Sequence, residues 1–458
     1  MKLKKLTLAN FRGFDQIDLD FADDMTVIAG INGVGKSGVL KALRSALSLA
    51  LPKFTVSRES PLGLTDTDVQ SSKHGLSMLV TLGLDETKVD VDLTRAAPLA
   101  ADKAESLSKR RDYLRFATRE TKKGSKEELE ITDEIRRIEK LLDQTLDIAS
   151  VRFLPDDVEA DENELVAHLK GESKQPLAVF YTTSRFLSRL PPTLPKTKKI
   201  NAATAYDKAL SQLEVSLNDF ANWYRVVESE AAAATRDRLF QQLEQAIKTF
   251  LPEVCNLALH DGRPPRFSVA KSGQTFFLEQ LSDGERGLLA LVFDLTRRLA
   301  IANPDSENPI AEGVALVLID EIELHLHPSW QRRVLRLLQN TFTRCQFVVS
   351  THSPQVIGQV RPEKLRLLHH DESGKVVQLN ASQSFGMDSS WILQNIMGVP
   401  ARDYGIEQRL SAIYHSIDED NLETARSLAE ELRADIGDFP DLQEVLALLD
   451  RFALLRSE

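Results

Sequence analysis

The stretch Gly30-Ile31-Asn32-Gly33-Val34-Gly35-Lys36-Ser37 decides the fold of this chain. It fits the pattern G-x-x-x-x-G-K-[ST], in which glycines let backbone N–H groups surround a polyphosphate at a helix N-terminus. An apolar run, Met25–Ala29, precedes it, and Gly38–Leu51 carries apolar residues at helical spacing. This strand, loop and helix pattern predicts that the chain binds a nucleoside triphosphate.

Each residue type in this loop has a chemical task. We expect Lys36 to reach the β- and γ-phosphates and the Ser37 hydroxyl to hold Mg²⁺. The residues expected to contact ATP are Gly30, Asn32, Gly33, Val34, Gly35, Lys36 and Ser37. Arg12 is a further candidate for nucleotide contact, and the alternative for it is a surface arginine in a turn.

A second apolar run, Ala315–Ile319, predicts a fully buried parallel strand. It ends in Asp320-Glu321. A carboxylate at that strand end can hold Mg²⁺ beside the phosphate loop, and we assign this task to Asp320. Glu321 is then placed to orient or deprotonate the attacking water. Together with the phosphate loop, this pair predicts a hydrolase.

Composition limits the class of protein. The chain has 458 residues, of which 42% are hydrophobic, enough for a sizeable core. Its two cysteines, Cys255 and Cys345, lie far apart, which argues against a disulfide framework or a zinc site and suits a reducing cytoplasm. No run of apolar residues is long enough for a membrane span. The polar residues Asn10, Arg12 and Asp15 interrupt the N-terminus, so no signal peptide is expected.

Charge is unevenly distributed along the chain. The net charge is −11, and residues 401–458 alone carry −8, whereas residues 103–126 carry +6. The basic segment 103–126 belongs to a predicted helical hairpin, about 103–149, and could contact nucleic-acid phosphates. The alternative for both segments is a solvated helical face.

The order of the patterns predicts an organisation in four parts. Residues 1–95 form the N-terminal half of an ATPase head, and residues 266–380 form its C-terminal half. Between them, residues 96–265 are predicted to be a mostly helical insertion that contains the short coiled-coil hairpin and a returning strand, Leu177–Tyr181. Residues 381–458 are predicted to form an acidic helical tail.

The stretch Leu281-Ser-Asp-Gly-Glu-Arg286 resembles the signature motif of ATP-binding-cassette and structural-maintenance-of-chromosomes (ABC/SMC) ATPases. Ser282 and Glu285 form a capping box, so the motif should open a helix. The resemblance implies an α/β fold of the ABC/SMC-type P-loop head, a mixed sheet with flanking helices. It also implies that Ser282, Gly284 and Glu285 act in trans on a nucleotide held by a second copy, in a head-to-tail dimer or a higher oligomer.

Two further stretches fit the same resemblance. His352 follows the apolar strand Phe347–Thr351 and looks like the switch histidine that contacts the γ-phosphate. Glu321–Pro328 resembles the dimer-facing loop; its His325 and His327 suggest a metal site only weakly, because no third ligand is evident. The glutamine that transporter ATPases place after the returning strand is missing here, and Arg185 is a candidate to sense nucleotide instead.

Leu288–Pro304, Leu318–Trp330 and Gln346–Gln355 resemble a narrower group, the PtuA-like ATPases of Septu and retron anti-phage systems. In that group the ATPase works with a separate HNH-type nuclease, PtuB-like, so the resemblance implies such a partner. The alternative is a RecF-like DNA-repair ATPase that binds DNA without a dedicated nuclease.

The segment after Leu379 is helical by pattern and lacks a strand-borne Asp-x-Asp, so it does not fit the Toprim nuclease that related enzymes append. If the output is cleavage of nucleic acid, we expect another chain to supply it. The apolar stripe Leu442, Val445, Leu446 and Leu449 could face the head or a partner, and we favour docking of the partner.

Overall fold

The computed structural model describes residues 1–70, 73, 75–84, 87–96, 101–120, 131–138, 148–155, 162–172, 174–400 and 402–457. These residues form two compact units, Met1–Gly386 and Met387–Glu458. The first unit contains three β-sheets, and the described part of the second contains helices.

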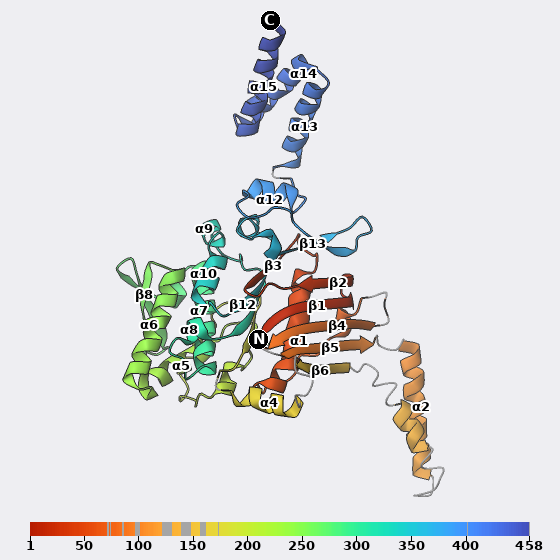
Figure 1. The fold of residues 1–458 in the computed structure, drawn as a ribbon, viewed down its shortest axis with the longest axis vertical. Coiled ribbons are helices and arrows are strands. Elements are labelled where there is room, and N and C mark those ends of the chain that lie inside the picture. Colours follow the sequence, from red (N-terminus) through yellow and green to blue (C-terminus); the bar gives the residue numbers. More distant parts are fainter. Residues whose placement is uncertain are drawn as a thin grey trace. The chain divides into compact units, whose positions relative to one another are not determined.

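A six-stranded mixed sheet carries the phosphate loop (Figure 1). Its strand order is β14-β13-β3-β12-β11-β7, and all neighbours are parallel except β13 and β14. The bounds are β3 Met25–Ala29, β7 Leu177–Tyr181, β11 Ala315–Ile319, β12 Gln346–Thr351, β13 Leu365–His370 and β14 Val376–Leu379. Every residue of β3, β7, β11 and β12 is buried, as in parallel strands covered on both faces. The predicted buried strands and the mixed sheet are confirmed.

A five-stranded antiparallel sheet, in the order β2-β1-β4-β5-β6, forms a second layer. Its strands are β1 Lys2–Phe11, β2 Phe14–Asp20, β4 Gly75–Leu84, β5 Thr87–Ala96 and β6 Ile148–Pro155. Helix α1 (Lys36–Phe54) contacts β4, β5 and β6 of this sheet and also β7, β11 and β12 of the mixed sheet. The helix that follows the phosphate loop is therefore held between two sheets, which fixes the loop at its N-terminus.

The helix opened by the signature stretch is α7 (Asp283–Ala302), and it is buried from Leu288 to Ala302. It packs against β7, α5 (Leu217–Glu230) and α6 (Ala233–Phe250). In this contact the ring of Phe293 stacks on Phe220 at 4.3 Å between centroids. A three-stranded sheet, β8 Val254–His260, β9 Arg266–Lys271 and β10 Gln274–Phe277, leads into the signature. Further helices of this unit are α2 Ala101–Glu120, α4 Glu162–Gly171, α8 Pro309–Glu312, α9 Pro328–Gln331, α10 Val334–Thr341 and α11 Pro354–Ile357.

The insertion is less helical than its pattern predicted. Strands β6 and β8 both lie in the segment 96–265, and Ile148 and Ala149, predicted as helix, belong to β6. Phe153 is the single buried residue of β6, so the strand shows no apolar alternation, and its pairing with β5 decides its conformation. Of the predicted hairpin, α2 and residues 131–138 are helical, and Arg110 joins them through an ion pair to Glu134 at 3.1 Å. The basic tip at 122–126 lies outside the described residues.

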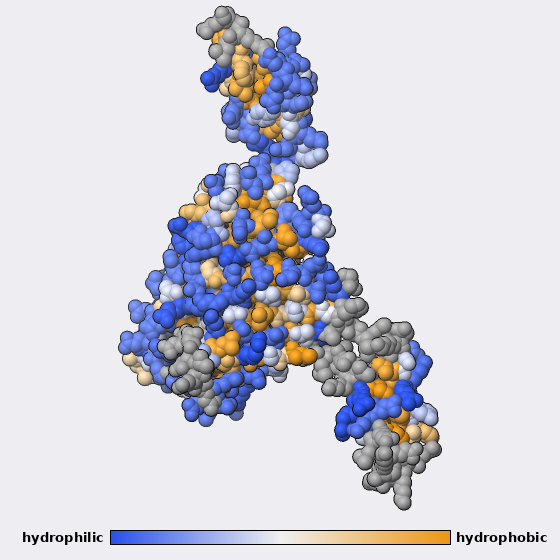
Figure 2. All heavy atoms as spheres, turned by 45° about the vertical axis from the view of Figure 1, so that its right-hand side comes forward, coloured by the Kyte–Doolittle hydropathy of each residue, from blue (hydrophilic) through white to orange (hydrophobic). Residues whose placement is uncertain are grey.

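The tail unit has a hydrophobic core of its own. Its helices are α12 Ser389–Asn395, α13 Tyr404–Asp418, α14 Leu422–Ile436 and α15 Pro440–Ser457. Leu442, Val445 and Leu449 are buried in a cluster with residues of α13 and α14, and Leu446 packs against it. The prediction that this stripe faces the head or a partner is therefore wrong, because three amphipathic helices cover one another. Figure 2 shows apolar side chains of this unit lying between hydrophilic ones.

None of the described helices combines the length and the hydropathy that a membrane span requires.

Candidate nucleotide site

The phosphate loop follows β3, and all three of its glycines have backbone conformations that other residues rarely adopt; Gly33 has φ +84°. Gly30 has φ +152°, and a Cβ there would lie 2.5 Å from the carbonyl oxygen of Leu368 on β13. Gly35 has φ +101°, and a Cβ there would lie 2.7 Å from the ring of Phe14. Packing of the loop between β13 and β2 therefore requires glycine at both positions.

Lys36 begins α1 and is almost completely buried. Its Nζ donates hydrogen bonds to the carbonyl oxygens of Gly30 at 2.8 Å and Ile31 at 2.9 Å. Burial lowers the pKa of Lys36, while the charges of Glu323 and Glu321 oppose that effect. The ammonium is thus held against the loop backbone, where a polyphosphate would supply the missing negative charge.

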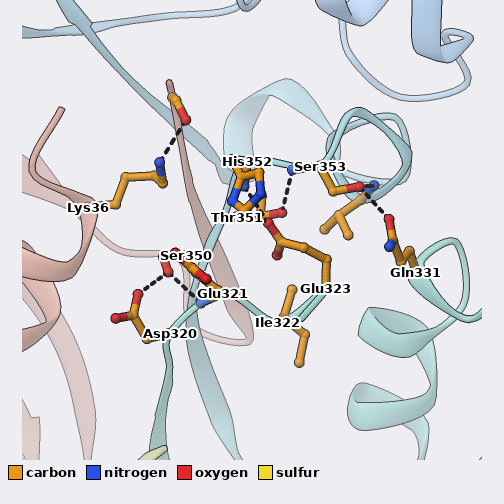
Figure 3. Close-up of polar contacts among 12 residues, drawn as sticks. Lys36, Asp320, Glu321, Ile322, Glu323, Gln331, Ser350, Thr351, His352 and Ser353 are labelled. Atoms are coloured by element: carbon orange, nitrogen blue, oxygen red, sulfur yellow. Dashed lines mark hydrogen bonds and ion pairs between the residues drawn. The ribbon is translucent and has the colours of Figure 1, made fainter. Parts of the chain in front are cut away.

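The structure brings the two motifs of the site together. Ser37 Oγ donates a hydrogen bond to Asp320 Oδ1 at 3.0 Å, although 283 residues separate them. Ser350 on β12 donates a second hydrogen bond to the same carboxylate oxygen (Figure 3). Because β3, β11 and β12 are parallel neighbours, their carboxyl ends meet at one edge of the sheet.

The backbone of Glu321 is fixed from two sides. Its N–H donates to Ser350 Oγ at 2.8 Å, and its carbonyl oxygen accepts a 2.7 Å hydrogen bond from Arg185. Glu321 has φ +47°, an uncommon value for a residue with a side chain. Its half-buried carboxylate makes no hydrogen bond within the described part of the chain. The structure therefore holds the backbone and leaves the carboxylate available to a water.

Arg185 does not have the free guanidinium that a nucleotide sensor needs. It is buried, and it donates to the carbonyl oxygens of Asp320 at 2.7 Å and of Ile322 at 3.0 Å as well as to that of Glu321. Burial lowers the pKa of Arg185 to about 10 against the charges of Glu323, Asp320 and Glu321. The expectation that Arg185 senses nucleotide is corrected: it is a positioning residue for the loop after β11.

His352 follows β12 and has a partner that the sequence analysis did not single out. Glu323 is buried, and its Oε1 accepts the backbone N–H of His352 at 2.6 Å and lies 3.0 Å from His352 Nδ1. Figure 3 shows the two side chains facing each other. Nδ1 makes no hydrogen bond with this carboxylate or with another described residue, and the expected contact of the imidazole with a γ-phosphate would use Nε2.

Arg12 lies in the turn between β1 and β2 with φ +51°, and its guanidinium pairs with Asp68 at 2.5 Å. Its Cδ would lie 3.5 Å from a Cβ on Gly38, in the first turn of α1. Arg12 is thus next to the helix that follows the loop, with its charge directed at Asp68. For the expected contact between Arg12 and nucleotide, the guanidinium would have to leave Asp68 or bind Asp68 and the nucleotide at the same time.

The signature residues lie at the N-terminus of α7. Ser282 is the N-cap and forms the predicted capping box with Glu285. Glu285 also pairs with Lys271 at 2.6 Å. A Cβ on Gly284 would lie 2.6 Å from the carbonyl oxygen of His325, so this helix packs closely on the loop Glu321–Pro328. None of these contacts involves the phosphate loop of the same chain.

The site fits a nucleotide with Mg²⁺. Ser37 Oγ and Asp320 Oδ1 offer the hydroxyl and carboxylate oxygens that Mg²⁺ prefers. Oε2 of Glu323 is buried without a hydrogen-bond partner among the described residues, so it is a further acceptor in the site. The two loop histidines have other contacts: His325 packs on Phe186 at 5.2 Å, and His327 Nδ1 lies 2.9 Å from Ser329 Oγ.

Sequence reasoning missed Ser350 and Glu323. Both could have been predicted from the sequence, because Ser350 is two residues before His352 and Glu323 is two residues after Glu321. Hydroxyl and carboxylate groups so close to strand ends are candidates for the same edge of the sheet. The role of Arg185 had no such signal, because all the acceptors of its guanidinium are backbone carbonyls.

Residues 25–358 match the family described as AAA domain, putative AbiEii toxin, Type IV TA system. This range contains the phosphate loop, the signature stretch, Asp320, Glu321 and His352. The match therefore spans both halves of the site.

The chain is also similar to individual proteins along much of its length. The chain is 25% identical over 438 residues to the Retron Ec83 probable ATPase of Escherichia coli, a match that covers 88% of this chain and 77% of that protein. It is 28% identical over 161 residues to Septu protein PtuA of Bacillus thuringiensis, covering 34% of this chain and 41% of that protein. Among solved structures, the SmcHead bound to the C-winged helix domain of ScpA aligns with a TM-score of 0.45 and 14% identity, covering 83% of this chain and 98% of that chain.

Proposed function

The chain belongs to the family of AAA domains described as putative AbiEii toxin, Type IV TA system, and on that premise we propose that it is the ATP-binding and ATP-hydrolysing subunit of an anti-phage defence complex. It is an ATPase. In the proposed complex it acts as sensor and scaffold and regulates a separate HNH-type, PtuB-like nuclease. The similarity to Septu protein PtuA and to the Retron Ec83 probable ATPase supports the defence role.

One contact carries the ATPase part of this proposal. The hydrogen bond from Ser37 to Asp320 joins the phosphate loop to the strand that supplies the metal-binding carboxylate. Glu321 follows directly, with a fixed backbone and a carboxylate available to a water. In the proposed reaction Lys36 neutralises the phosphates, Glu321 orients and deprotonates the water, and His352 contacts the γ-phosphate. Ser37 and Asp320 would hold a Mg²⁺ ion, which would supply further positive charge beside the phosphates.

The second half of the site is proposed to come from another copy of the chain. The N-terminus of α7 favours an anion, and Ser282 and Gly284 lie there without contact to the phosphate loop of their own chain. A head-to-tail dimer would place this N-terminus on the γ-phosphate bound by the partner. Each dimer would then contain two composite sites.

Mixing two inactive variants tests this arrangement. Ser282→Arg should retain nucleotide binding and lose hydrolysis, because its phosphate loop is intact. Lys36→Ala should lose nucleotide binding. In a mixed dimer one composite site carries neither defect, so ATPase activity should return on mixing, as measured by phosphate release. Full ATPase activity in a wild-type chain that remains monomeric at the assay concentration would contradict the dimer.

The nuclease partner is proposed to dock on the tail unit. This unit has its own core, and the segment 401–458 carries −8 of the net charge. A chain ending at Gly386 should keep its melting temperature and ATPase rate but lose co-purification with the HNH-type nuclease expressed beside it. The cut falls between the two compact units, so no helix is divided. Co-purification that survives the cut would contradict docking on the tail and would make the basic segment 103–126 the next surface to test.

A further inference from the structure

A basic groove of about 270 Å³ lies in the first unit, lined mainly by residues of the segments 332–339 and 359–364 and by Phe385. Its charged lining consists of Arg332, Arg336, Arg361 and Lys364, and Leu335 and Phe385 are among its apolar lining residues. Arg336 lies in the first turn of α10, Arg332 lies in the turn between α9 and α10, and Arg361 follows α11. The whole chain has a net charge of −11, so these cationic side chains make the surface around the groove positive where the protein as a whole is negative.

The arginines of the basic groove lack acidic partners. Lys364 pairs with Asp24 at 2.5 Å, but no ion pair or hydrogen bond of the described residues involves the guanidinium groups of Arg332, Arg336 or Arg361. Like charges that line one groove repel one another, so placing Arg332, Arg336 and Arg361 around it is unfavourable unless an anion offsets their charge. The groove therefore favours a polyanion.

An exposed aromatic ring completes the basic groove. Phe385 is 54% exposed, an unusual exposure for a phenylalanine. The guanidinium of Arg361 lies over its ring, 5.5 Å from the centroid. A base could stack on this ring while its phosphates meet the arginines, which is how single-stranded nucleic acids are bound without sequence preference.

The basic groove is joined to the switch histidine by a short path. Ser353, the residue after His352, donates a hydrogen bond to Gln331 at 2.7 Å (Figure 3). Gln331 precedes Arg332, and Ser353 is the N-cap of α11, whose end leads to Arg361. An occupant of the groove would thus contact both segments that this hydrogen bond connects.

We propose that the basic groove binds single-stranded nucleic acid, with phosphates on Arg332, Arg336 and Arg361 and a base stacked on Phe385. An acidic protein segment could use the same arginines. It would not use a flat exposed ring beside planar guanidinium groups, which fit phosphates in a bidentate manner. A duplex keeps its bases paired and cannot stack one on Phe385. The groove is separate from the basic hairpin and does not depend on the nuclease partner.

Binding of a labelled single-stranded oligothymidylate to the full chain, followed by fluorescence anisotropy over a range of salt concentrations, tests the proposal. Arg336→Ala/Arg361→Ala removes two phosphate contacts, so the slope of log K against log salt should fall by about 1.4. Arg189→Ala/Lys196→Ala removes the same charge from exposed positions outside the groove and should leave the slope unchanged.

The aromatic contact is tested separately. Phe385→Ala should weaken binding of the single strand by about tenfold or more, Phe385→Tyr should retain it, and a matched duplex should show no difference among the three. Nucleic acid should also change the ATPase rate of the wild type, and this response should be lost in Arg336→Ala/Arg361→Ala.

Three results would overturn the proposal. The first is no binding at low salt. The second is binding that the groove variants leave unchanged but that Lys109→Ala/Arg111→Ala in α2 removes, which would assign the nucleic acid to the hairpin. The third is equal binding of polyglutamate with no effect of Phe385→Ala, which would identify an acidic protein segment as the occupant.

Discussion

Replacing Glu321 with glutamine should leave ATP binding intact and lower the rate of hydrolysis by about 10²- to 10⁴-fold, the range that a general base contributes. Glutamine has nearly the same shape but cannot accept the proton of the attacking water. The backbone hydrogen bonds of Glu321 to Ser350 and Arg185 do not involve its side chain, so the loop should keep its conformation. Single-turnover hydrolysis and nucleotide affinity, measured on the same preparation, separate the two effects.

Glu323→Gln is the matched control, because it makes the same change two residues further along. Glu323 is buried next to His352, so this variant should change the position of the imidazole and lower the stability of the site. Its effect on the abstraction of the proton from water should be smaller. Lys36→Ala provides the reference without nucleotide binding. If Glu321→Gln hydrolyses ATP at a near-normal rate while Glu323→Gln does not, the general base is Glu323 and our assignment is wrong.

Asp294→Asn should lower the free energy of unfolding by about 3–5 kcal/mol, the effect of removing one partner from a buried ion pair. Asp294 lies in the middle of α7 and pairs with Arg297 and Arg298, each at 2.8 Å, and all three side chains are buried. Tyr181 also donates to Asp294 at 3.0 Å, and the carbonyl oxygen of Tyr181 accepts the N–H of Asp320 at 2.9 Å. We therefore expect the ATPase rate to fall together with stability.

Denaturant unfolding measures this effect, and Asp18→Asn is the control. Asp18 pairs with Lys5 at 3.2 Å on the surface, where an ion pair contributes about 1 kcal/mol or less. Equal losses of unfolding free energy in Asp294→Asn and Asp18→Asn would show that the buried ion pair stabilises the protein no more than the surface ion pair does. The double variant Asp294→Leu/Arg298→Leu should lose less than the two single changes together, because it removes both charges of that contact; Arg297 still loses its partner, so a loss of stability remains.

The Asp294 contribution has a defined pH dependence. Burial alone would raise the pKa of Asp294, but Arg298 and Arg297 outweigh it and hold the pKa well below its usual range. Because the folded pKa is lower than the unfolded one, the stabilisation is present above about pH 4 and is lost as the pH falls toward the folded value. Near neutral pH, wild type and Asp294→Asn should therefore show their full difference.

The sequence by itself determined the parts of this protein that are local in the chain. The phosphate loop, the strand ending in Asp320-Glu321 and the capping box of Ser282 each need only a few neighbouring residues. The phosphate loop requires glycines, the buried strand requires an apolar run, and the helix cap requires a hydroxyl, each at a defined position. These requirements can be recognised in the sequence without knowledge of the fold. The resemblance to a known class of ATPases rests on the same stretches.

Tertiary structure alone decided what depends on contacts between distant segments. Strand β6 has almost no apolar pattern and exists because β5 offers it a free edge. The stripe of α15 could have met any apolar surface, and it meets α13 and α14 because they lie nearest in the chain. Arg185 binds backbone carbonyls, and the basic groove collects side chains from three separate segments and Phe385. Every residue has a backbone carbonyl, and residues far apart in the chain share no local pattern. Such contacts therefore cannot be predicted from local sequence and are known only from the tertiary structure.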